Sequence, residues 1–139
     1  LMAKRGSVPK PFNGGQWTAS RMASFIKGGL RTLSRKWPPK YETLKRAMVG
    51  RRLDPATGKM SNRYQCAGCG NLFKQADVQV DHIDPVVSVT DGFIDWNEYI
   101  MRMFCEADGL QVLCSECHGV KTQNESKQRK EAKNELQQP

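Results

Sequence analysis

The amino-acid sequence predicts an α+β fold, in which a basic and mostly helical N-terminal part precedes a small domain of short strands and helices. Apolar residues recur at helical spacing in the first half of the chain, and they alternate with polar residues in short stretches of the second half. Paired cysteines flank those stretches. The length of 139 residues and the hydrophobic content of 38% fit one domain with a modest core and an additional arm.

Positive charge is concentrated in the first half. The net charge of the chain is +8, but residues 1–63 contain 15 Lys or Arg against only Glu42 and Asp54, and residues 64–139 contain 7 Lys or Arg against 12 acids. A basic half of this kind favours a polyanionic partner, and nucleic acid is the polyanion we expect. No apolar run reaches the roughly 18 residues of a membrane helix, and no apolar signal segment opens the chain, so neither membrane insertion nor secretion is expected.

The first half is expected to contain an arm and two helices. Residues 1–15 are rich in glycine, proline and basic residues, which predicts a disordered or extended basic arm. Residues 16–63 are predicted to form a basic, helical DNA-binding leader and linker. Apolar spacing indicates helices over residues 18–34 and 41–49, separated by a Trp-Pro-Pro sequence. Residues 54–58 have the composition of a turn and are interpreted as the linker.

Residues 64–139 are predicted to form the second domain. Residues 78–82 alternate between apolar and polar side chains, which indicates a strand. Residues 95–104 have an Asp at the expected N-cap and a Glu three positions later, which predicts a helix. Residues 110–113 lead into the second cysteine pair, and a helix is expected from residue 118 to about residue 137.

Four of the five cysteines form two C-x-x-C pairs. In a chain without a secretion signal, this spacing favours metal ligands over disulfides. Two pairs supply the four thiolates of a tetrahedral structural zinc site. The 44 residues between the pairs predict a sizeable insertion, and the fifth cysteine, Cys105, is expected to be a buried free thiol. The predicted zinc ligands are Cys66, Cys69, Cys114 and Cys117.

The only two histidines lie at points that the zinc would bring together. His82 follows Asp81 at the end of the predicted strand, and His118 directly follows the last cysteine. Hydrolysis of a phosphodiester needs a base for water and a divalent cation, roles that imidazole and carboxylate groups suit. Structural alternatives stay open: His82 as a hydrogen-bonded strand-end residue, Asp81 as a turn cap, and His118 as a spectator or as a ligand in place of Cys117.

Residues 80–85 (VDHIDP) and 110–122 (LQVLCSECHGVKT) resemble the HNH endonucleases of the ββα-metal type. The likeness is greatest to the small phage-type HNH proteins with a four-cysteine zinc site, and it covers about residues 64–125. Residues 33–39 (LSRKWPP) are similar to the basic leader of such phage proteins. The resemblance implies a nuclease fold of two strands and a helix around a catalytic divalent ion.

The resemblance also implies a role for each site residue. The position of His82 is that of the general base on water, Asp81 and His118 match the ligands of a catalytic Mg²⁺, Mn²⁺ or other divalent transition metal, and the four cysteines match the ligands of a structural zinc. The implied reaction is hydrolysis of DNA phosphodiester bonds, one strand at a time, which leaves a 5′-phosphate and a 3′-hydroxyl.

One motif position departs from the family. The middle asparagine, which in the family braces the loop that orients the base histidine, is replaced by Gly109. Asn97 and Asn124 are candidate supporting residues, Asn124 as an extra ligand or phosphate contact. Two alternatives stay open, namely a non-catalytic zinc-stabilised module that binds DNA or RNA, and a basic ribosome-like protein, which leaves both histidines unexplained.

DNA is the expected partner, held through phosphate contacts that are sensitive to salt. No heptad pattern or large apolar patch indicates a dimer, so a monomer is expected. The resemblance further implies the cytoplasm of a phage-infected bacterial cell, and a role beside phage DNA-packaging machinery or as a mobile-element nuclease. The residues expected to contact nucleic acid are Arg35, Lys36, Lys45, Arg46, Arg51, Arg52 and Lys121.

Overall fold

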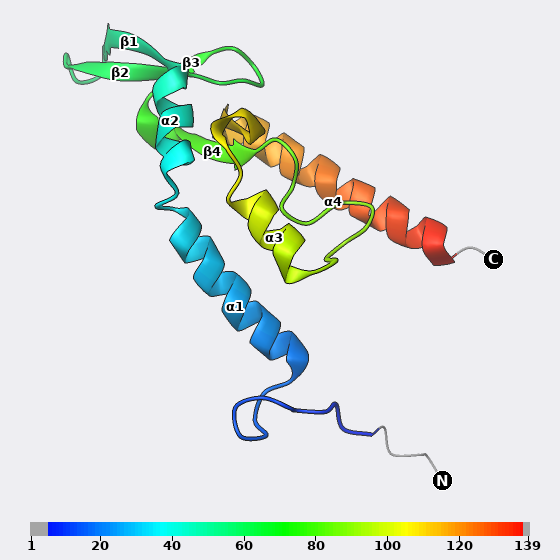
Figure 1. Ribbon diagram of the computed structural model, residues 1–139. Helices are drawn as coiled ribbons and strands as arrows, with labels where there is room; N and C mark the ends of the chain where they lie inside the picture. Colours follow the sequence, from blue (N-terminus) through cyan, green and yellow to red (C-terminus); the bar gives the residue numbers. More distant parts are fainter. Residues whose placement is uncertain (1–5, 138–139) are drawn as a thin grey trace. The chain divides into compact units, whose positions relative to one another are not determined.

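The computed structural model describes residues 6–137 and has the α+β fold that the sequence predicts, with four α-helices and two small sheets in that range (Figure 1). The chain divides into two compact units, Leu1–Lys36 and Trp37–Pro139. Within the described residues, no helix has both the length and the apolar content needed to cross a bilayer. The helices are α1 (Ala19–Ser34), α2 (Pro38–Ala47), α3 (Trp96–Met103) and α4 (Ser115–Gln137), and the strands are β1 (Met48–Leu53), β2 (Met60–Gln65), β3 (Leu72–Phe73), β4 (Val78–His82) and β5 (Leu110–Cys114).

Among the described residues of the first unit, a turn precedes helix α1. The Thr18 hydroxyl caps this helix by accepting a hydrogen bond of 3.1 Å from the backbone N–H three residues later. Before it, Phe12 and Trp17 close a tight turn through two backbone hydrogen bonds of 3.2 and 2.9 Å. Part of the predicted arm is therefore an ordered turn. Residues 1–5 of the arm lie outside the described residues.

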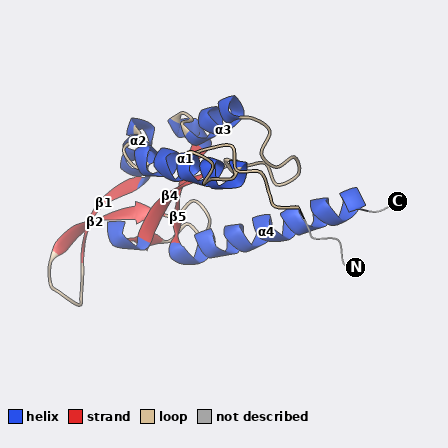
Figure 2. Ribbon diagram, turned by 90° about the horizontal axis from the view of Figure 1, so that it is seen from below, coloured by secondary structure: helices blue, strands red, loops and turns tan. Residues whose placement is uncertain are grey.

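The sheet that carries the predicted site is the antiparallel pair of β4 and β5. Asp81 pairs with Gln111 and His82 pairs with Leu110. Because successive side chains of a strand alternate between faces, Asp81 and His82 lie on opposite faces of this sheet. Helix α4 covers the face of Asp81, and α2 and α3 lie on the other side (Figure 2).

The second sheet is an antiparallel meander in the order β1-β2-β3. Its hairpin turns at Asp54, a buried residue whose Oδ1 accepts from the Ala56 N–H at 2.9 Å and whose carboxylate pairs with Lys74. The sequence-based expectation of a helical leader is therefore wrong for residues 48–53 and 60–63, which form the strands of a hairpin, while the turn predicted at residues 54–58 lies between these strands. All but one of the residues of β1 and half of those of β2 are exposed, so the hairpin lacks the apolar alternation that signals a strand.

Helix boundaries also differ from those expected. Helix α2 begins at Pro38, three residues before the predicted start, because proline suits the first helical position, where no N–H partner is needed. Helix α4 begins at Ser115, where the Cys117 N–H donates to the Cys114 Sγ at 3.4 Å within the first turn. Helix α3 has the predicted cap, in which Asp95 accepts from the Glu98 N–H at 2.8 Å.

The hydrophobic core of the second unit lies beside the cysteines. Cys66, Leu113 and Cys114 form a buried cluster, against which Phe73 and Cys117 pack. A domain of this size buries little apolar surface. A metal held by these cysteines would therefore contribute directly to the free energy of folding.

Candidate metal centre and active site

The four predicted zinc ligands converge on one point. Their Sγ atoms all lie within 4.8 Å of one another, and a tetrahedral zinc with Zn–S bonds of about 2.3 Å places its sulfurs roughly 3.8 Å apart. Among residues 6–137, this is the one group of three or more His, Cys, Asp or Glu side chains close enough to hold a metal ion. The four cysteines thus fit the donor set of a structural zinc.

The environment of the thiols also fits a metal centre. Cys66 is buried, and the backbone N–H groups of Gly68 and Cys114 each donate to its Sγ at 3.3 Å. Burial by itself raises the pKa of Cys66, but these N–H donors outweigh it and lower the pKa to about 6. The neighbouring thiols of Cys114 and Cys66 raise the pKa of Cys117 to about 12. A cation among the sulfurs relieves that crowding of negative charge.

Gly68 is required by the close approach of the two cysteine pairs. A Cβ atom at this position would lie 2.9 Å from the Cys117 Sγ and 3.0 Å from its Cβ. Any larger residue would push the second pair away from the first. Close packing against Cys117 therefore explains why the first C-x-x-C pair contains a glycine.

Two of the predicted catalytic residues come together on the face of the sheet that α4 covers. The Asp81 Oδ1 lies 3.7 Å from the His118 Nε2. His118 reaches this position because it follows Cys117 in the first turns of α4, next to the cysteine cluster. Gln111, the cross-strand partner of Asp81, lies with its Nε2 3.5 Å from the Asp81 Oδ2.

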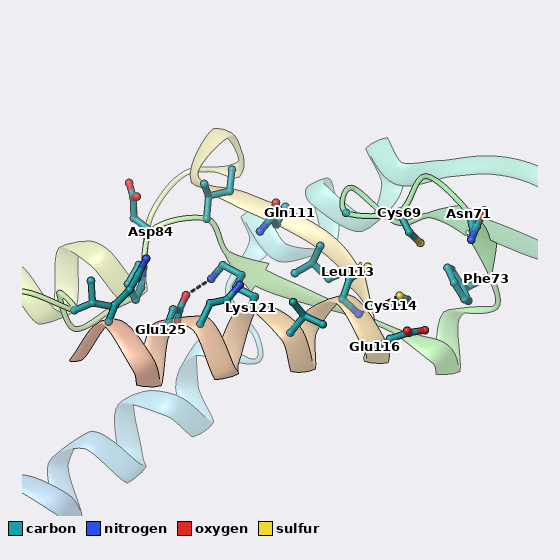
Figure 3. A pocket seen from close by; sticks show the side chains of 18 residues that line it. Cys69, Asn71, Phe73, Asp84, Gln111, Leu113, Cys114, Glu116, Lys121 and Glu125 are labelled. Atoms are coloured by element: carbon teal, nitrogen blue, oxygen red, sulfur yellow. Dashed lines mark hydrogen bonds and ion pairs between the residues drawn. The ribbon is translucent and has the colours of Figure 1, made fainter. Parts of the chain in front are cut away.

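Lys121 occupies a cradle of oxygen atoms beside this pair. Its Nζ lies 2.9 Å from the Asp81 Oδ2, 2.8 Å from the His82 carbonyl oxygen and 2.5 Å from the Glu125 Oε1, and the last contact is visible in Figure 3. Burial by itself lowers the pKa of Lys121, but the bonds to Glu125 and Asp81 outweigh it and raise the pKa, so the group stays charged. Lys121, predicted as a phosphate contact, is thus held by two carboxylates.

The His82 side chain makes its contact at the opposite side of the sheet. Its Nε2 lies 2.8 Å from the backbone carbonyl oxygen of Met103, at the end of α3. A carbonyl oxygen only accepts, so Nε2 must carry the proton of the neutral ring, and Nδ1 is left as the acceptor. His82 is therefore not part of the Asp81–His118 contact, but its free lone pair is the one that a general base needs.

An open pocket of about 950 Å³ extends along α4 from the first cysteine pair to the segment after β4 (Figure 3). Lys121, Glu125 and Asn124 line it from α4, and Asp84 lines it from the other side. Asn97 lies elsewhere, on the wall of a second pocket of about 510 Å³ that Asp84 also lines. Of the two candidate supporting residues, only Asn124 borders the pocket beside Lys121.

The segment after β4 is tied to both neighbouring helices. The Arg102 guanidinium of α3 donates to the Pro85 carbonyl oxygen at 2.9 Å, and that of Arg129 in α4 donates to the Val87 carbonyl oxygen at 2.8 Å. Neither arginine was singled out from the sequence, because a side chain that binds a distant backbone carbonyl leaves no local signal.

The predicted nucleic-acid contacts differ in how far their charges are already paired. Arg46 lies 3.2 Å from a carboxylate oxygen of Glu42 and 3.2 Å from one of Asp108. Arg51 and Arg52 are exposed on β1, donate to backbone carbonyls of their own hairpin, and form no ion pair with an acid among residues 6–137. Three other predicted contacts are exposed, namely Arg35, Lys36 and Lys45.

Gly109 has a local structural role. Its carbonyl oxygen accepts from the Ile83 N–H at 2.9 Å, directly after His82. A Cβ atom at Gly109 would lie 3.0 Å from the Cys105 Sγ, so the half-buried thiol of Cys105 fills the space that a larger residue would need. The absence of a side chain at position 109 therefore makes room for the thiol of Cys105.

Comparisons of the chain with protein-family models, with curated proteins and with solved structures each find no significant match.

Proposed function

We propose that this chain is a divalent-metal-dependent DNA endonuclease of the HNH type, with a structural zinc at the four cysteines. The observation that carries the proposal is the placement of Asp81 and His118 3.7 Å apart beside the cysteine cluster. The neighbouring His82 is held in the tautomer that leaves Nδ1 as a base.

The donor set at Asp81 and His118 fits a hydrolytic divalent ion. A carboxylate oxygen and an imidazole nitrogen are ligands that Mn²⁺ and other divalent transition metals accept, and Mg²⁺ prefers the oxygen. Asp81 and His118 would be the two protein ligands of such an ion. When bound, such an ion neutralises charge on the phosphate and on the leaving oxygen.

The residues of the chain would divide the remaining work. Asp81 and His82 face opposite sides of the sheet, so the phosphate would have to lie past the end of β4, which is His82, for both side chains to reach it. There His82 takes a proton from the attacking water at Nδ1, while Nε2 stays bonded to the Met103 carbonyl oxygen. The water oxygen forms the new bond to phosphorus, and the bond from phosphorus to the 3′-oxygen breaks. The 3′-oxygen takes a proton from solvent, which gives a 5′-phosphate and a 3′-hydroxyl. One such centre cuts one strand, so the expected product of a single event is a nick.

DNA would be held through phosphate contacts by the basic residues. Arg51 and Arg52 on the hairpin suit this role best within the second unit, because no carboxylate among residues 6–137 is paired with either. We place the nuclease in the cytoplasm of a phage-infected bacterium, where it would act as a monomer beside the DNA-packaging machinery or as a mobile-element nuclease.

A non-catalytic zinc-stabilised module that binds DNA or RNA is the second candidate. The observation that favours it is the Lys121 ammonium on Asp81, because a carboxylate neutralised by a lysine can serve the fold alone. In that case Asp81, His82 and His118 would all be structural.

A plasmid assay separates the two candidates. Supercoiled plasmid is incubated with the zinc-loaded protein in Mg²⁺, Mn²⁺ or EDTA, alongside His82→Ala and the matched control Gln79→Ala, an exposed residue of the same strand. If the chain is a nuclease, the wild type and the control nick the plasmid in a metal-dependent manner. His82→Ala does not, although its zinc content and melting temperature are unchanged. Tight DNA binding without cleavage in any metal would overturn the nuclease and favour the binding module.

A further inference from the structure

Three consecutive residues at the end of α3 connect His82 to a distant tryptophan. The Met103 carbonyl oxygen takes the His82 Nε2–H at 2.8 Å. The Cys105 carbonyl oxygen accepts from the indole Nε1–H of Trp37 at 2.6 Å. Between them, the Phe104 ring packs edge to face against the Trp37 ring, with the centroids 5.5 Å apart at an angle of 87°.

The carbonyl that holds His82 needs support from outside its own helix. The last four carbonyl groups of an α-helix have no intrahelical donor, and Met103 is the last residue of α3. Phe104 leaves the helical conformation, with φ −102° and ψ 51°. The direction of the Met103 carbonyl therefore depends on how residues 104 and 105 are held, and Trp37 contacts both of them.

Trp37 is well suited to hold them because its own backbone is restrained. It is the N-cap of α2, and the two prolines that follow keep it extended, at φ −65° and ψ 116°. Its carbonyl oxygen accepts from the Lys40 N–H at 3.0 Å. The indole donor therefore comes from a stiff segment at the start of a helix.

The other end of the same loop also closes on His82. The Gly109 carbonyl oxygen accepts from the Ile83 N–H, and Gly109 packs against Cys105. Residues 103–109 therefore bind the end of β4 at two points, namely the imidazole of His82 and the backbone N–H of Ile83. Trp37 ties the first part of this loop to the start of α2, and the ion pair between Arg46 and Asp108 ties its last part to the same helix.

We propose that Trp37 is a positioning residue for His82. Its indole N–H holds the Cys105 carbonyl, its ring holds Phe104, and together they fix the Met103 carbonyl that keeps the His82 proton on Nε2. The consequence for catalysis rests on the proposed nuclease function, but the coupling between Trp37 and the imidazole does not.

The imidazole can be observed directly because the chain has only two histidines. In the zinc-loaded wild-type protein, at a pH where the ring is neutral, the protected Nε2–H of His82 should give a downfield proton resonance coupled to its nitrogen. A His118→Gln variant assigns the signal. In Trp37→Phe, which keeps an aromatic ring but loses the donor, this resonance should disappear and the two ring-nitrogen shifts should move towards each other.

Trp96→Phe is the matched control. Trp96 belongs to an aromatic cluster with Phe93 and Tyr99 at the start of α3, so its loss should leave the His82 resonance in place. In the plasmid assay, Trp37→Phe should slow nicking by between about 10-fold and 100-fold with KM unchanged, because it disturbs the orientation of the base and not DNA binding.

An unchanged His82 resonance and unchanged nitrogen shifts in Trp37→Phe would overturn the proposal. If that variant loses zinc or fails to fold, site-specific replacement of Trp37 by β-(3-benzothienyl)alanine decides, because it has the shape of tryptophan without the N–H. Loss of the resonance there supports the proposal, and retention overturns it. A wild-type protein that nicks no DNA but shows the Trp37-dependent resonance would overturn the nuclease alone.

Discussion

Lys121 places a positive charge on the carboxylate that the proposed catalytic metal would use. Its ammonium contacts Asp81, Glu125 and the His82 carbonyl oxygen, all of which are oxygen donors of the kind that hard cations prefer. A divalent ion at Asp81 and His118 therefore has to compete with the lysine. The ion can bind only if the lysine contacts are given up, so its apparent binding free energy is less favourable by the free energy of those contacts.

Replacing Lys121 by methionine should therefore tighten metal binding. We expect Lys121→Met to bind Mn²⁺ about tenfold more tightly, equivalent to about 1.4 kcal/mol, by isothermal titration calorimetry of the zinc-loaded protein. Lys127→Met, on an exposed part of the same helix, should leave the affinity unchanged. An equal or weaker affinity in Lys121→Met would mean that the lysine organises Asp81 for the ion.

Gly68 gives a second prediction at the scale of a residue. A methyl group there meets the Cys117 Sγ at 2.9 Å, so Gly68→Ala should force the two cysteine pairs apart, weaken zinc binding and lower the melting temperature. Competition with a zinc chelator measures the affinity. Gly119→Ala is the control, because it has open space in α4, where alanine favours a helix by about 1 kcal/mol over glycine. Equal zinc affinities in the two variants would contradict the packing role of Gly68.

The sequence predicts those site residues whose signal is local. Spacing alone identifies the four cysteines. Asp81 lies near the end of the predicted strand and His118 directly follows the last cysteine, and these positions identify the two residues as neighbours. Glu125 was missed, although its spacing of four residues from Lys121 on one helix face could have indicated it. The Trp37 contact with Cys105 spans 68 residues, and no spacing rule predicts a hydrogen bond to a backbone carbonyl so far away.

Among the elements, the β1–β2 hairpin differs most from expectation. Helix α3 was predictable from the Asp at its N-cap with a Glu three positions later. Strand β4 was predictable from its alternation of apolar and polar residues. The hairpin has no such pattern, because most of its side chains are exposed. Its stability depends on its turn, where Asp54 accepts from the Ala56 N–H and pairs with Lys74.

The hairpin turn should make the protein sensitive to acid. The bond from Lys74 and the Ala56 N–H hold the pKa of Asp54 below its ordinary value of 3.8. A carboxyl group whose pKa is lower in the folded state stabilises the fold above its unfolded-state pKa, and that stability is lost as the pH falls through the folded-state pKa. The melting temperature should therefore fall below about pH 4.

Asp54→Asn tests this dependence, since asparagine keeps an acceptor for the Ala56 N–H but carries no charge. This variant should melt lower than the wild type at neutral pH, and the difference should shrink as the pH falls. Thermal melts followed by circular dichroism at several pH values give both curves. A constant difference down to the lowest pH would show that the charge of Asp54 contributes nothing.

At the scale of the whole molecule, the charge divides along the two structural units. Residues 1–36 contain eight Lys or Arg and no acid, so residues 37–139 contain 14 basic and 14 acidic side chains. The entire net charge of +8 therefore belongs to the first unit. For a polyanion such as DNA, the first unit would supply the general electrostatic attraction, and the second would supply the proposed site, with balanced charge.

Removing the first unit should therefore flatten the salt dependence of DNA binding. Each phosphate contact adds about 0.9 to the slope of log K against log salt concentration. We expect deletion of residues 1–36 to weaken binding to a DNA duplex at low salt and to reduce this slope, measured by fluorescence anisotropy, while zinc stays bound. An unchanged slope would assign the phosphate contacts to the second unit, with Arg51 and Arg52 as the first residues to test.

The pairing of β4 with β5 has a consequence for how strictly the chain must fold. Asp81 and His82 are neighbours on one strand and serve opposite faces of the sheet, so a slip by a single residue would exchange carboxylate and imidazole between the two faces. Cys114 prevents this slip, because it pairs with Val78 at one end of the ladder and belongs to the cysteine cluster. A zinc ion there would fix the register of the two strands. A chain without zinc would lose the correct placement of the Asp81 carboxylate and the His82 imidazole before it lost its helices.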